Sequence, residues 1–477
     1  MKDVLIVGGG LAGLAAAVAL ADAGLKVQLL ESRPRLGGRA SSFEDSTTGE
    51  VIDNCQHVAM GCCTNFWHFC RVTGLDSAFR REPFLTFVGP PDSTGECPPD
   101  FCRFQAATFP FACAPWHLSS AFAGLSYLSN QDRFAIVCGL LAIVSDRPQP
   151  DDRRSFADWL RVNQQPASTI ERFWDIVLVS ALSESLDRIS YASARKVFVD
   201  GFLAHRAGWE VWLPTVPLDV LYSDRLLPWL ADRGVDVRLK TGVERLVEDG
   251  GRILAVELRN GEQLTAQQFV LAVPHHRVLD LLPESLRDHS LIEDVEQLES
   301  APIASVHLWF DRPITLLPNA VLVGRLSQWV FNRSSVAKTG SFAGSPSSHY
   351  YQVVISNARI LATRPHSEVV ADVVAELKSV WPWAGDAQLQ HSRVVVEHHA
   401  VFSPLPGSDE IRLPQQSPIS NLQFAGDWTR TGWPATMEGA VRSGFLAAEN
   451  VLNQLGRTDR WLQPDLPIDW PLRLILR

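Results

Sequence analysis

The chain of 477 residues lacks any apolar run that reaches the roughly 18 residues a helix needs to span a bilayer. The longest apolar run, Phe134 to Val144, is too short for that purpose. It predicts a buried helix, and the alternative is a segment that dips into one face of a membrane. The sequence therefore excludes a helical membrane span.

The cysteines lack the spacing of a metal site. None of the 8 cysteines forms a C-x-x-C pair or a Cys/His ligand pattern, and Cys62 and Cys63 are directly adjacent. Zinc sites and disulfide scaffolds both have recognisable spacings, which are absent here. We therefore expect free thiols, a reducing compartment and no metal ion.

Positive charge is also in short supply. The chain has 43 Lys and Arg against 53 Asp and Glu, giving a formal net charge of -10 at pH 7. Proteins that bind nucleic acids usually carry a basic patch or stripe, and this sequence has none. Nucleic acid is therefore excluded as a partner.

The most informative feature that is present lies at the N-terminus. An apolar run, Val4 to Val7, leads into Gly8, Gly10 and Gly13, and a helical pattern follows from Leu14 to Leu20. In such a G-x-G-x-x-G turn the glycines permit a tight turn, close approach to a pyrophosphate, and close packing of helix on strand. The phosphates then lie at a helix N-terminus. This spacing predicts a dinucleotide-binding site.

Glu31 follows the second predicted strand, Lys26 to Leu30, at the position where a carboxylate can bind the ribose hydroxyls of a dinucleotide. It would repel a 2′-phosphate, so the ligand is FAD or NAD. A secretory signal is the alternative for this N-terminal segment, but the glycine spacing and Asp3 argue against it. The predicted contacts in this segment are Gly8, Gly10, Leu11, Ala12, Gly13, Glu31 and Ser32.

Further motifs distinguish between the two dinucleotides. Gly37, Gly38 and Arg39 follow Glu31 in a pattern that resembles the E-x(5)-GGR signature of the flavin amine oxidase and carotenoid desaturase superfamily. Phe424 to Trp428 and Thr436 to Ala440 resemble the closing motif of the same superfamily. The resemblance implies FAD as the cofactor. It also implies contacts to FAD by Gly37, Gly38, Arg39, Val243, Gly426, Asp427 and Met437.

The positions of these motifs predict the domain organisation. The superfamily resemblance implies an α/β fold, in which a Rossmann-like FAD/NAD(P)-binding domain is assembled from discontinuous segments beside an α+β substrate-binding domain. We expect the FAD domain to comprise residues 1–75, 205–285 and 395–455. Residues 76–204 and 286–394 would then form the substrate domain, and 456–477 a C-terminal tail.

The chain has 15 Trp and 23 Phe but only 5 Tyr, and many of the Trp and Phe residues lie in the two insertions that would form the substrate domain. Most should be core residues, and the others suit a long apolar tunnel whose aromatic faces could also stabilise a carbocation. An amine substrate would instead require polar recognition groups that the sequence does not reveal.

The segment Ile52 to Asn65 narrows the choice of substrate. It is similar to a stretch of plant-type phytoene and zeta-carotene desaturases, and it resembles more closely the D-N-C-Q-H-V-x-x-G-C-C-T-N signature of the hydroxysqualene dehydroxylase family. That resemblance implies reductive removal of the allylic hydroxyl of hydroxysqualene by reduced FAD, giving squalene for hopanoid or sterol synthesis. Ser183 departs from the family pattern, which more often has Asn there. A carotenoid-type desaturase, an amine oxidase and a non-catalytic lipid-binding flavoprotein are the alternatives.

This chemistry needs an acid that protonates the leaving hydroxyl. The candidates are His57 and Asp53, whose segment should run beside the flavin, and then Glu210. Asp53 could instead cap a turn, and His57 could simply pack in the core. The reaction also needs an electron donor, which no motif identifies.

The tail from Trp461 to Arg477 combines aromatic and aliphatic residues with cations, as interfacial anchors do. We therefore expect a cytoplasmic protein that attaches peripherally to the inner face of the cytoplasmic membrane. The alternative is that the tail folds back on the FAD domain.

Overall fold

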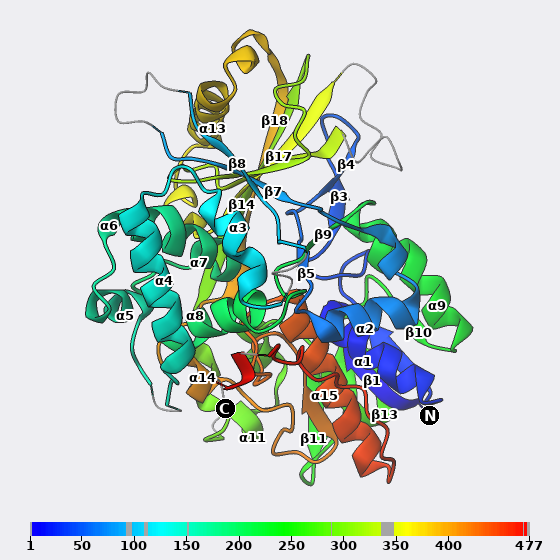
Figure 1. The fold of residues 1–477 in the computed structure, drawn as a ribbon. Helices are drawn as coiled ribbons and strands as arrows, with labels where there is room; N and C mark the ends of the chain where they lie inside the picture. The colour runs from blue at the N-terminus through cyan, green and yellow to red at the C-terminus, as the bar shows by residue number, and fades with distance from the viewer. Residues whose placement is uncertain are drawn as a thin grey trace.

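The computed structural model describes residues 2–91, 98–108, 113–149, 152–287, 289–334, 348–470 and 472–474. A mainly parallel sheet lies in the lower half of Figure 1, with strands in the order β10, β2, β1, β13, β12 and β11, while β19 pairs with β13. The strands are β1 (Lys2–Val7), β2 (Val27–Leu30), β10 (Asp236–Arg238), β11 (Val243–Asp249), β12 (Arg252–Leu258), β13 (Gln263–Leu271) and β19 (Leu422–Phe424). The dinucleotide turn follows β1, at the centre of this sheet.

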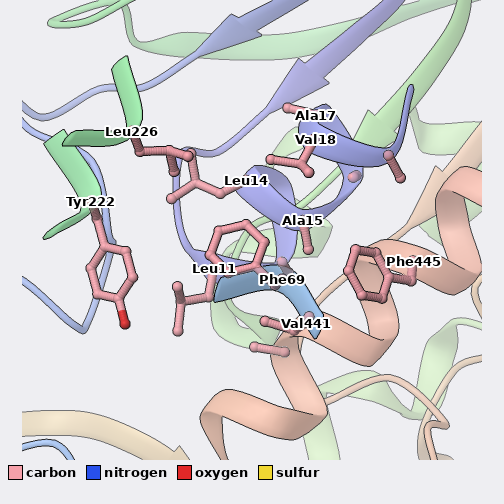
Figure 2. Packing of buried hydrophobic residues seen from close by; sticks show 14 of the residues in the cluster. Leu11, Leu14, Ala15, Ala17, Val18, Phe69, Tyr222, Leu226, Val441 and Phe445 are labelled. Carbon is pink, nitrogen blue, oxygen red and sulfur yellow. The ribbon is translucent and has the colours of Figure 1, made fainter. Parts of the chain in front are cut away.

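Helix α1 (Leu11–Asp22) is the centre of the first hydrophobic core. Its sequence is rich in alanine and leucine, which favour helix, and its residues are buried on every side up to Ala21. Figure 2 shows Leu14 and Ala15 of α1 among Phe69, Tyr222 and Phe445. These side chains come from α2 (Thr64–Thr73), η5 (Val220–Arg225) and α15 (Met437–Gln454), so distant segments meet on one helix.

The closest helix contact in this core is made by Gly444 of α15. A Cβ built on Gly444 would lie 2.2 Å from the carbonyl oxygen of Ala12 and 2.8 Å from the Cβ of Ala15. Only glycine allows α15 to pack so closely against α1. This packing places the N-terminus of α15 near the turn that follows β1.

A second sheet lies in the upper half of Figure 1, in the order β18, β14, β17, β16, β15, β7 and β8. Helix α13 (His366–Val380) covers one of its faces, through Val369, Val373 and Leu377. The strands are β7 (Leu85–Val88), β8 (Phe101–Phe104), β14 (Ser300–Phe310), β15 (Asn319–Leu322), β16 (Trp329–Asn332), β17 (His349–Ile355) and β18 (Leu389–Phe402). β18 belongs to this sheet as far as Phe402, so the sheet continues past the expected boundary at residue 395.

Two small sheets connect the large ones. One pairs β3 (Ser42–Glu44) with β4 (Val51–Asp53), and the other contains β5 (Ala59–Met60), β9 (Val211–Pro214) and β6 (Phe79–Arg81). The segment between β4 and β5 lies against the second sheet, because its Val58 clusters with Leu85 of β7 and Phe331 of β16, together with Leu213 of β9.

Most of the remaining helices form a group at one side of the molecule (Figure 1). They are α3 (Ser119–Ala123), α4 (Asn130–Ser145), α5 (Phe156–Val162), α6 (Ala167–Thr169), α7 (Asp175–Leu182) and α8 (Tyr191–Phe198). Elsewhere lie α9 (Leu226–Asp232), α10 (His275–Leu281), α11 (Glu284–Arg287) and α14 (Ser408–Ile411).

The prediction that Phe134 to Val144 forms a buried helix is wrong for one of its faces. The segment lies in α4, which buries Ile136, Gly139 and Ile143. Phe134, Val137 and Leu141 are 73 %, 43 % and 60 % exposed. Their spacing of three and four residues places them on one face of the helix. An apolar run shows no periodicity of its own, so the sequence could not reveal that only one face is covered.

The C-terminal tail folds back on the molecule. Trp461 is buried against His68 and Phe445, and its backbone N–H donates to Glu449 Oε1 at 2.6 Å. Further along, Leu472 packs with Val144 of α4. Trp470 remains 71 % exposed. Pro471 and residues 475–477 of the predicted anchor lie outside the described residues.

Candidate active site

Each glycine of the first turn is required for a different structural reason. Gly8 has φ +110, and a Cβ there would lie 2.3 Å from the carbonyl oxygen of Ala272. A Cβ on Gly13 would lie 1.9 Å from the carbonyl oxygen of Gly8, so both glycines are required by the protein itself. A Cβ on Gly10 would come no closer than 3.8 Å to the protein, at Gly38 Cα. The protein leaves this side of Gly10 open, as the approach of a pyrophosphate requires.

The second glycine pair lies directly against the first turn. Gly37 N–H donates to the carbonyl oxygen of Gly9 at 2.9 Å, and a Cβ on Gly38 would lie 2.9 Å from Gly10 Cα. Two backbone segments without side chains thus face each other at the N-terminus of α1, together with Leu11 and Ala12. Such a cradle fits a diphosphate, which binds backbone N–H groups and the positive end of a helix.

Glu31 lies at the end of β2 and is held by backbone donors. Its Oε2 accepts from Gly9 N–H at 2.7 Å, and its Oε1 accepts from Arg33 N–H at 2.8 Å and from the Ser32 hydroxyl at 3.2 Å. An ionised carboxylate has about four acceptor positions, so it retains capacity for ribose hydroxyls. Val243, at the start of β11, is buried in the same cluster as Leu30.

Arg39 and Asp427 bind each other. Their ion pair measures 2.6 Å, and Arg39 also donates to the carbonyl oxygen of Ala400 at 2.9 Å. Burial opposes the charge on Arg39, but the Asp427 carboxylate outweighs that effect and raises the pKa of Arg39. Gly426 N–H donates to the Ser443 hydroxyl at 2.8 Å, which fixes this motif on α15.

The N-terminus of α15 is fixed by its own cap and by a link to α2. The Thr436 hydroxyl accepts from Gly439 N–H at 3.0 Å, while the buried carboxylate of Glu438 accepts from the backbone N–H groups of Asn65 and Phe66 at 3.2 and 2.8 Å. Glu438 therefore ties the start of α15 to the start of α2. Met437, the first residue of α15, contacts the Tyr222 hydroxyl through its sulfur at 3.9 Å. A helix N-terminus held in this way can stabilise negative charge on a flavin.

Asp53 lies at the end of β4, and its side chain is completely buried. Its carboxylate accepts from the Ser42 hydroxyl at 2.7 Å, from Leu218 N–H at 2.9 Å and from Arg333 Nη2 at 2.7 Å. These three partners occupy both carboxylate oxygens of Asp53 and hold the side chain within the protein. The geometry therefore favours the structural role for Asp53.

His57 lies four residues further along the same segment. Its Nδ1 lies 3.1 Å from the carbonyl oxygen of Cys55, so Nδ1 carries a hydrogen and Nε2 is the acceptor in the neutral ring. Burial lowers the pKa of His57. The role of His57 as an acid stays a prediction, and it would require protonation at Nε2.

Glu210 shares none of the hydrogen-bond partners named above for Asp53. Its carboxylate forms an ion pair of 2.6 Å with Arg81, and it remains 22 % exposed. The backbone carbonyl of Glu210 accepts from Gly61 N–H at 2.8 Å, so the residue supports the turn after β5. Its contacts describe a residue at the edge of the small sheet.

The sequence reasoning missed a group of buried polar residues on the second sheet. Gln56 and Arg333 are hydrogen-bonded to each other, and Gln352 donates to the Ser305 hydroxyl at 2.8 Å. Ser305 and Gln352 lie on neighbouring strands, β14 and β17. Polar residues that alternate with apolar ones in an otherwise buried strand, as Ser305 and His307 do, are the signal that could have identified this group.

The same sheet face becomes apolar toward β7. Phe331 and Trp329 of β16 stack with ring centroids 5.5 Å apart, and they belong to a cluster with Leu213 of β9 and Val58. The face opposite α13 therefore has a polar end beside Asp53 and an aromatic end beside Val58. Within the described ranges no three His, Cys, Asp or Glu side chains converge in a way that could hold a metal ion.

The fold and the glycine cradle define a dinucleotide-binding protein with a second large sheet. Residues 11–452 match the family described as flavin containing amine oxidoreductase, and the chain belongs to this family. It is an FAD-dependent oxidoreductase. The match confirms the predicted superfamily, fold class and cofactor.

Relatives and solved structures agree with this assignment. The chain is 26 % identical over 481 residues to 15-cis-phytoene desaturase of Capsicum annuum, covering 96 % of this chain and 80 % of the relative. It is 27 % identical over 476 residues to zeta-carotene desaturase of Zea mays, covering 92 % and 82 %.

Two solved structures are similar in fold. An oxidoreductase from Methanosarcina mazei has a TM-score of 0.70 at 17 % identity, covering 95 % of this chain and 100 % of the other. Putrescine oxidase bound to putrescine has a TM-score of 0.67 at 16 % identity, covering 96 % and 99 %. At these identities the similarity shows the fold.

Proposed function

We propose that this flavoenzyme acts on a long apolar isoprenoid and that its reaction is the reductive removal of the allylic hydroxyl of hydroxysqualene. The observation that carries the proposal is the sheet face opposite α13, which combines buried polar groups at one end with stacked aromatics at the other. A long hydrocarbon with one oxygen atom is complementary to such a face. The similarity of residues 52–65 to the hydroxysqualene dehydroxylase signature supports the same substrate.

In this reaction the C–O bond breaks, the hydroxyl leaves as water, and a C–H bond forms at the same carbon. Bound FAD in its reduced form supplies the two electrons and the hydrogen that the carbon receives. Protonation of the hydroxyl is assigned to His57 in its imidazolium form, in which Nε2 carries the proton that is transferred and Nδ1–H stays bonded to the Cys55 carbonyl oxygen. Trp329 and Phe331 would stabilise an allylic cation with their ring faces and would exclude water.

Carotenoid-type desaturation is the second candidate. It is favoured by the relatives, since phytoene and zeta-carotene desaturases match almost the whole chain. Desaturation would use the same apolar face but would leave the polar end without a partner on the substrate. The two reactions also differ in the flavin state that reacts, because desaturation requires oxidised FAD.

Anaerobic mixing separates the candidates. Reduced holoenzyme mixed with hydroxysqualene should regain the absorbance of oxidised flavin and yield squalene. Loss of that absorbance when oxidised holoenzyme meets phytoene, with no reaction of hydroxysqualene, would establish the desaturase instead. Tight binding of both lipids without any change in flavin absorbance would identify a lipid-binding flavoprotein.

We also propose that the enzyme collects its substrate at the inner face of the cytoplasmic membrane. The described part of the chain has no helix long and apolar enough to cross a membrane. The contact is assigned to the exposed face of α4, defined by Phe134, Val137 and Leu141, which carries no charged side chain. The exposed Arg147 follows this helix and suits anionic headgroups. Trp470 is the part of the tail that could add to this contact, since Trp461 is buried.

A further inference from the structure

The polar end of the second sheet contains a hydrogen-bond chain that is complete except at one atom. His307 of β14 is completely buried, and its two ring nitrogens lie 2.7 Å from the Tyr350 hydroxyl and 3.2 Å from the Ser305 hydroxyl. Burial lowers the pKa of His307 to about 3, so this ring is neutral. Ser305 in turn accepts from Gln352 Nε2 at 2.8 Å. The chain therefore leads from Tyr350 to the amide of Gln352.

The amide oxygen of Gln352 is the incomplete point. Gln352 is 0 % exposed, and its Nε2 also lies 3.5 Å from the backbone carbonyl oxygen of Asp53. Its Oε1 is buried and has no hydrogen-bond partner among the residues that the structure describes. Leaving a buried acceptor unsatisfied costs folding free energy, so the unpaired oxygen of Gln352 needs an explanation, and a donor that arrives from outside the chain supplies one.

The surroundings of Gln352 indicate what kind of donor would arrive. Across the sheet its neighbour on β16 is Phe331, the stacked aromatic of the apolar end. The backbone carbonyl oxygen of Asp53 lies 3.5 Å from Gln352 Nε2. The Asp53 carboxylate is already bound by Arg333 and Ser42. Gln352 thus lies at the boundary between polar and apolar halves, where a ligand with a long hydrocarbon body and one polar group would place that group. The amide oxygen accepts only, so the polar group must be a donor such as an alcohol.

We propose that Gln352 is the alcohol-recognition residue of the substrate site, with Oε1 accepting the hydrogen bond of an O–H group on an isoprenoid alcohol. This inference rests on the proposed function for the length and apolarity of the ligand. Ser305 and His307 are positioning residues. The Ser305 hydroxyl accepts from Gln352 Nε2 and so orients the amide, and His307 in turn contacts the Ser305 hydroxyl. A hydrocarbon without a donor leaves Oε1 unsatisfied, so the site discriminates against it.

The proposal is tested by ligand binding to the oxidised holoenzyme, in which hydroxysqualene has no reductant. Three ligands are compared: hydroxysqualene, its O-methyl ether and squalene. The ether retains the oxygen but has no donor, so it should bind like squalene, and hydroxysqualene should bind about 10-fold more tightly than either. Equal affinities for alcohol and ether in the wild-type protein would overturn the proposal without any variant.

Substitution then assigns the preference to one side chain. Gln352→Leu removes the amide at nearly constant length and should reduce affinity for hydroxysqualene about 10-fold while changing that for squalene less than about twofold. The matched control is Tyr351→Phe, which removes a buried hydroxyl that donates to Thr315 on the opposite side of the strand at 2.9 Å. If Gln352 has a purely structural role, the Gln352→Leu protein would bind hydroxysqualene and squalene more weakly by the same factor, or would keep its preference for the alcohol. Either result refutes the assignment. Preferential binding of hydroxysqualene without turnover would instead refute the proposed reaction and leave the subsite standing.

Discussion

The Asp53 carboxylate lies 2.7 Å from the Arg333 guanidinium, and the two side chains are 0 % and 2 % exposed. A buried ion pair is held in place because either partner alone would be an uncompensated charge in an apolar environment. This pair joins Asp53, at the end of β4, to Arg333, directly after β16, and it therefore fixes the polar end of the site. The burial and contacts of Asp53 are better explained by this ion pair than by a role in proton transfer.

Asp53→Asn tests the structural role of the ion pair with Arg333. Removing the negative charge takes from the buried Arg333 the carboxylate with which it pairs, so the free energy of unfolding should fall by about 3–5 kcal/mol, with partial loss of bound FAD. Urea denaturation followed by tryptophan fluorescence measures the loss. Asp280→Asn is the control, because its ion pair with Arg277 is exposed and its loss should change stability by less than about 1 kcal/mol. Normal stability combined with a large loss of rate would return Asp53 to the list of acids.

His57→Gln tests the acid itself. The variant should keep its FAD but slow the reoxidation of reduced flavin by hydroxysqualene about 10²-fold or more, as loss of a general acid does. Single-turnover reoxidation, normalised to bound flavin, is the measurement. A rate within about threefold of wild type would move the acid to Asp53 or to an ordered water.

The pH dependence gives a second check on His57. Burial lowers the pKa of His57 below its usual 6.5, so the ring is neutral at pH 7 and only a minor fraction is protonated. If the protonated ring is the acid, the reoxidation rate should rise as the pH falls from 7.5 toward the lowered pKa and level off below it. The His57→Gln protein should lack this rise.

The cofactor half of the site could be predicted from sequence because its signals are local. Gly8, Gly10 and Gly13 lie within one turn, and the conformation of that turn requires glycine regardless of the rest of the fold. The substrate half could not be predicted in the same way. Gln352 lies 299 residues from Asp53, and only the pairing of β14 with β17 and the packing of β4 bring the two together. Asp53 was recognisable as an acid, but its Arg333 partner was not.

The exposed side of α4 illustrates the opposite difficulty. The sequence of this helix shows that it is apolar, whereas its burial depends on which neighbours happen to cover it. Ile136 and Ile143 are covered by the surrounding helices, and Phe134 and Leu141 are not. Hydrophobicity alone therefore identifies a helix but leaves its outer face undetermined.

The glycine cradle predicts a contrast between two substitutions. Gly10→Val should give a folded but colourless protein, because the protein leaves 3.8 Å beside Gly10 while a bound pyrophosphate would be blocked. Gly13→Val should instead impair folding, since its Cβ would lie 1.9 Å from the Gly8 carbonyl oxygen. Gly385→Val, where no atom lies within 4 Å, is the control. Flavin content and the thermal midpoint distinguish the three, and a full complement of FAD in Gly10→Val would refute the placement.

Three buried histidines predict acid sensitivity. Burial lowers the pKa of His307 to about 3 and the pKa values of His275 and His117 to about 4, whereas their unfolded-state values are near 6.5. Between these values the unfolded chain binds protons that the folded protein does not, so stability falls as the pH falls below 6.5. Each histidine contributes at most about 1.4 kcal/mol per pH unit.

Urea denaturation between pH 7.5 and 5 measures this effect, because carboxylates with lowered pKa values lose their contribution at more acidic pH. Asp175 opposes it in part, since burial raises the pKa of this carboxyl group to about 6. His307→Phe should reduce the slope of stability against pH, although it also removes two hydrogen bonds and lowers stability at pH 7. Constant wild-type stability from pH 6.5 to 5 would show that these histidines titrate normally in the folded protein.

The last prediction separates the two candidate membrane contacts. Phe134 and Leu141 are 73 % and 60 % exposed on one uncharged face of α4, so placing Glu at both positions should abolish flotation with anionic liposomes while leaving FAD content and stability unchanged. Trp470→Glu changes the exposed residue of the tail without disturbing the buried Trp461, and it should reduce flotation only partly. Leu316→Glu is the matched control, since Leu316 is 87 % exposed outside that helix and should not affect flotation. If the α4 variant still floats and Trp470→Glu does not, the tail is the anchor and the assignment to α4 is wrong.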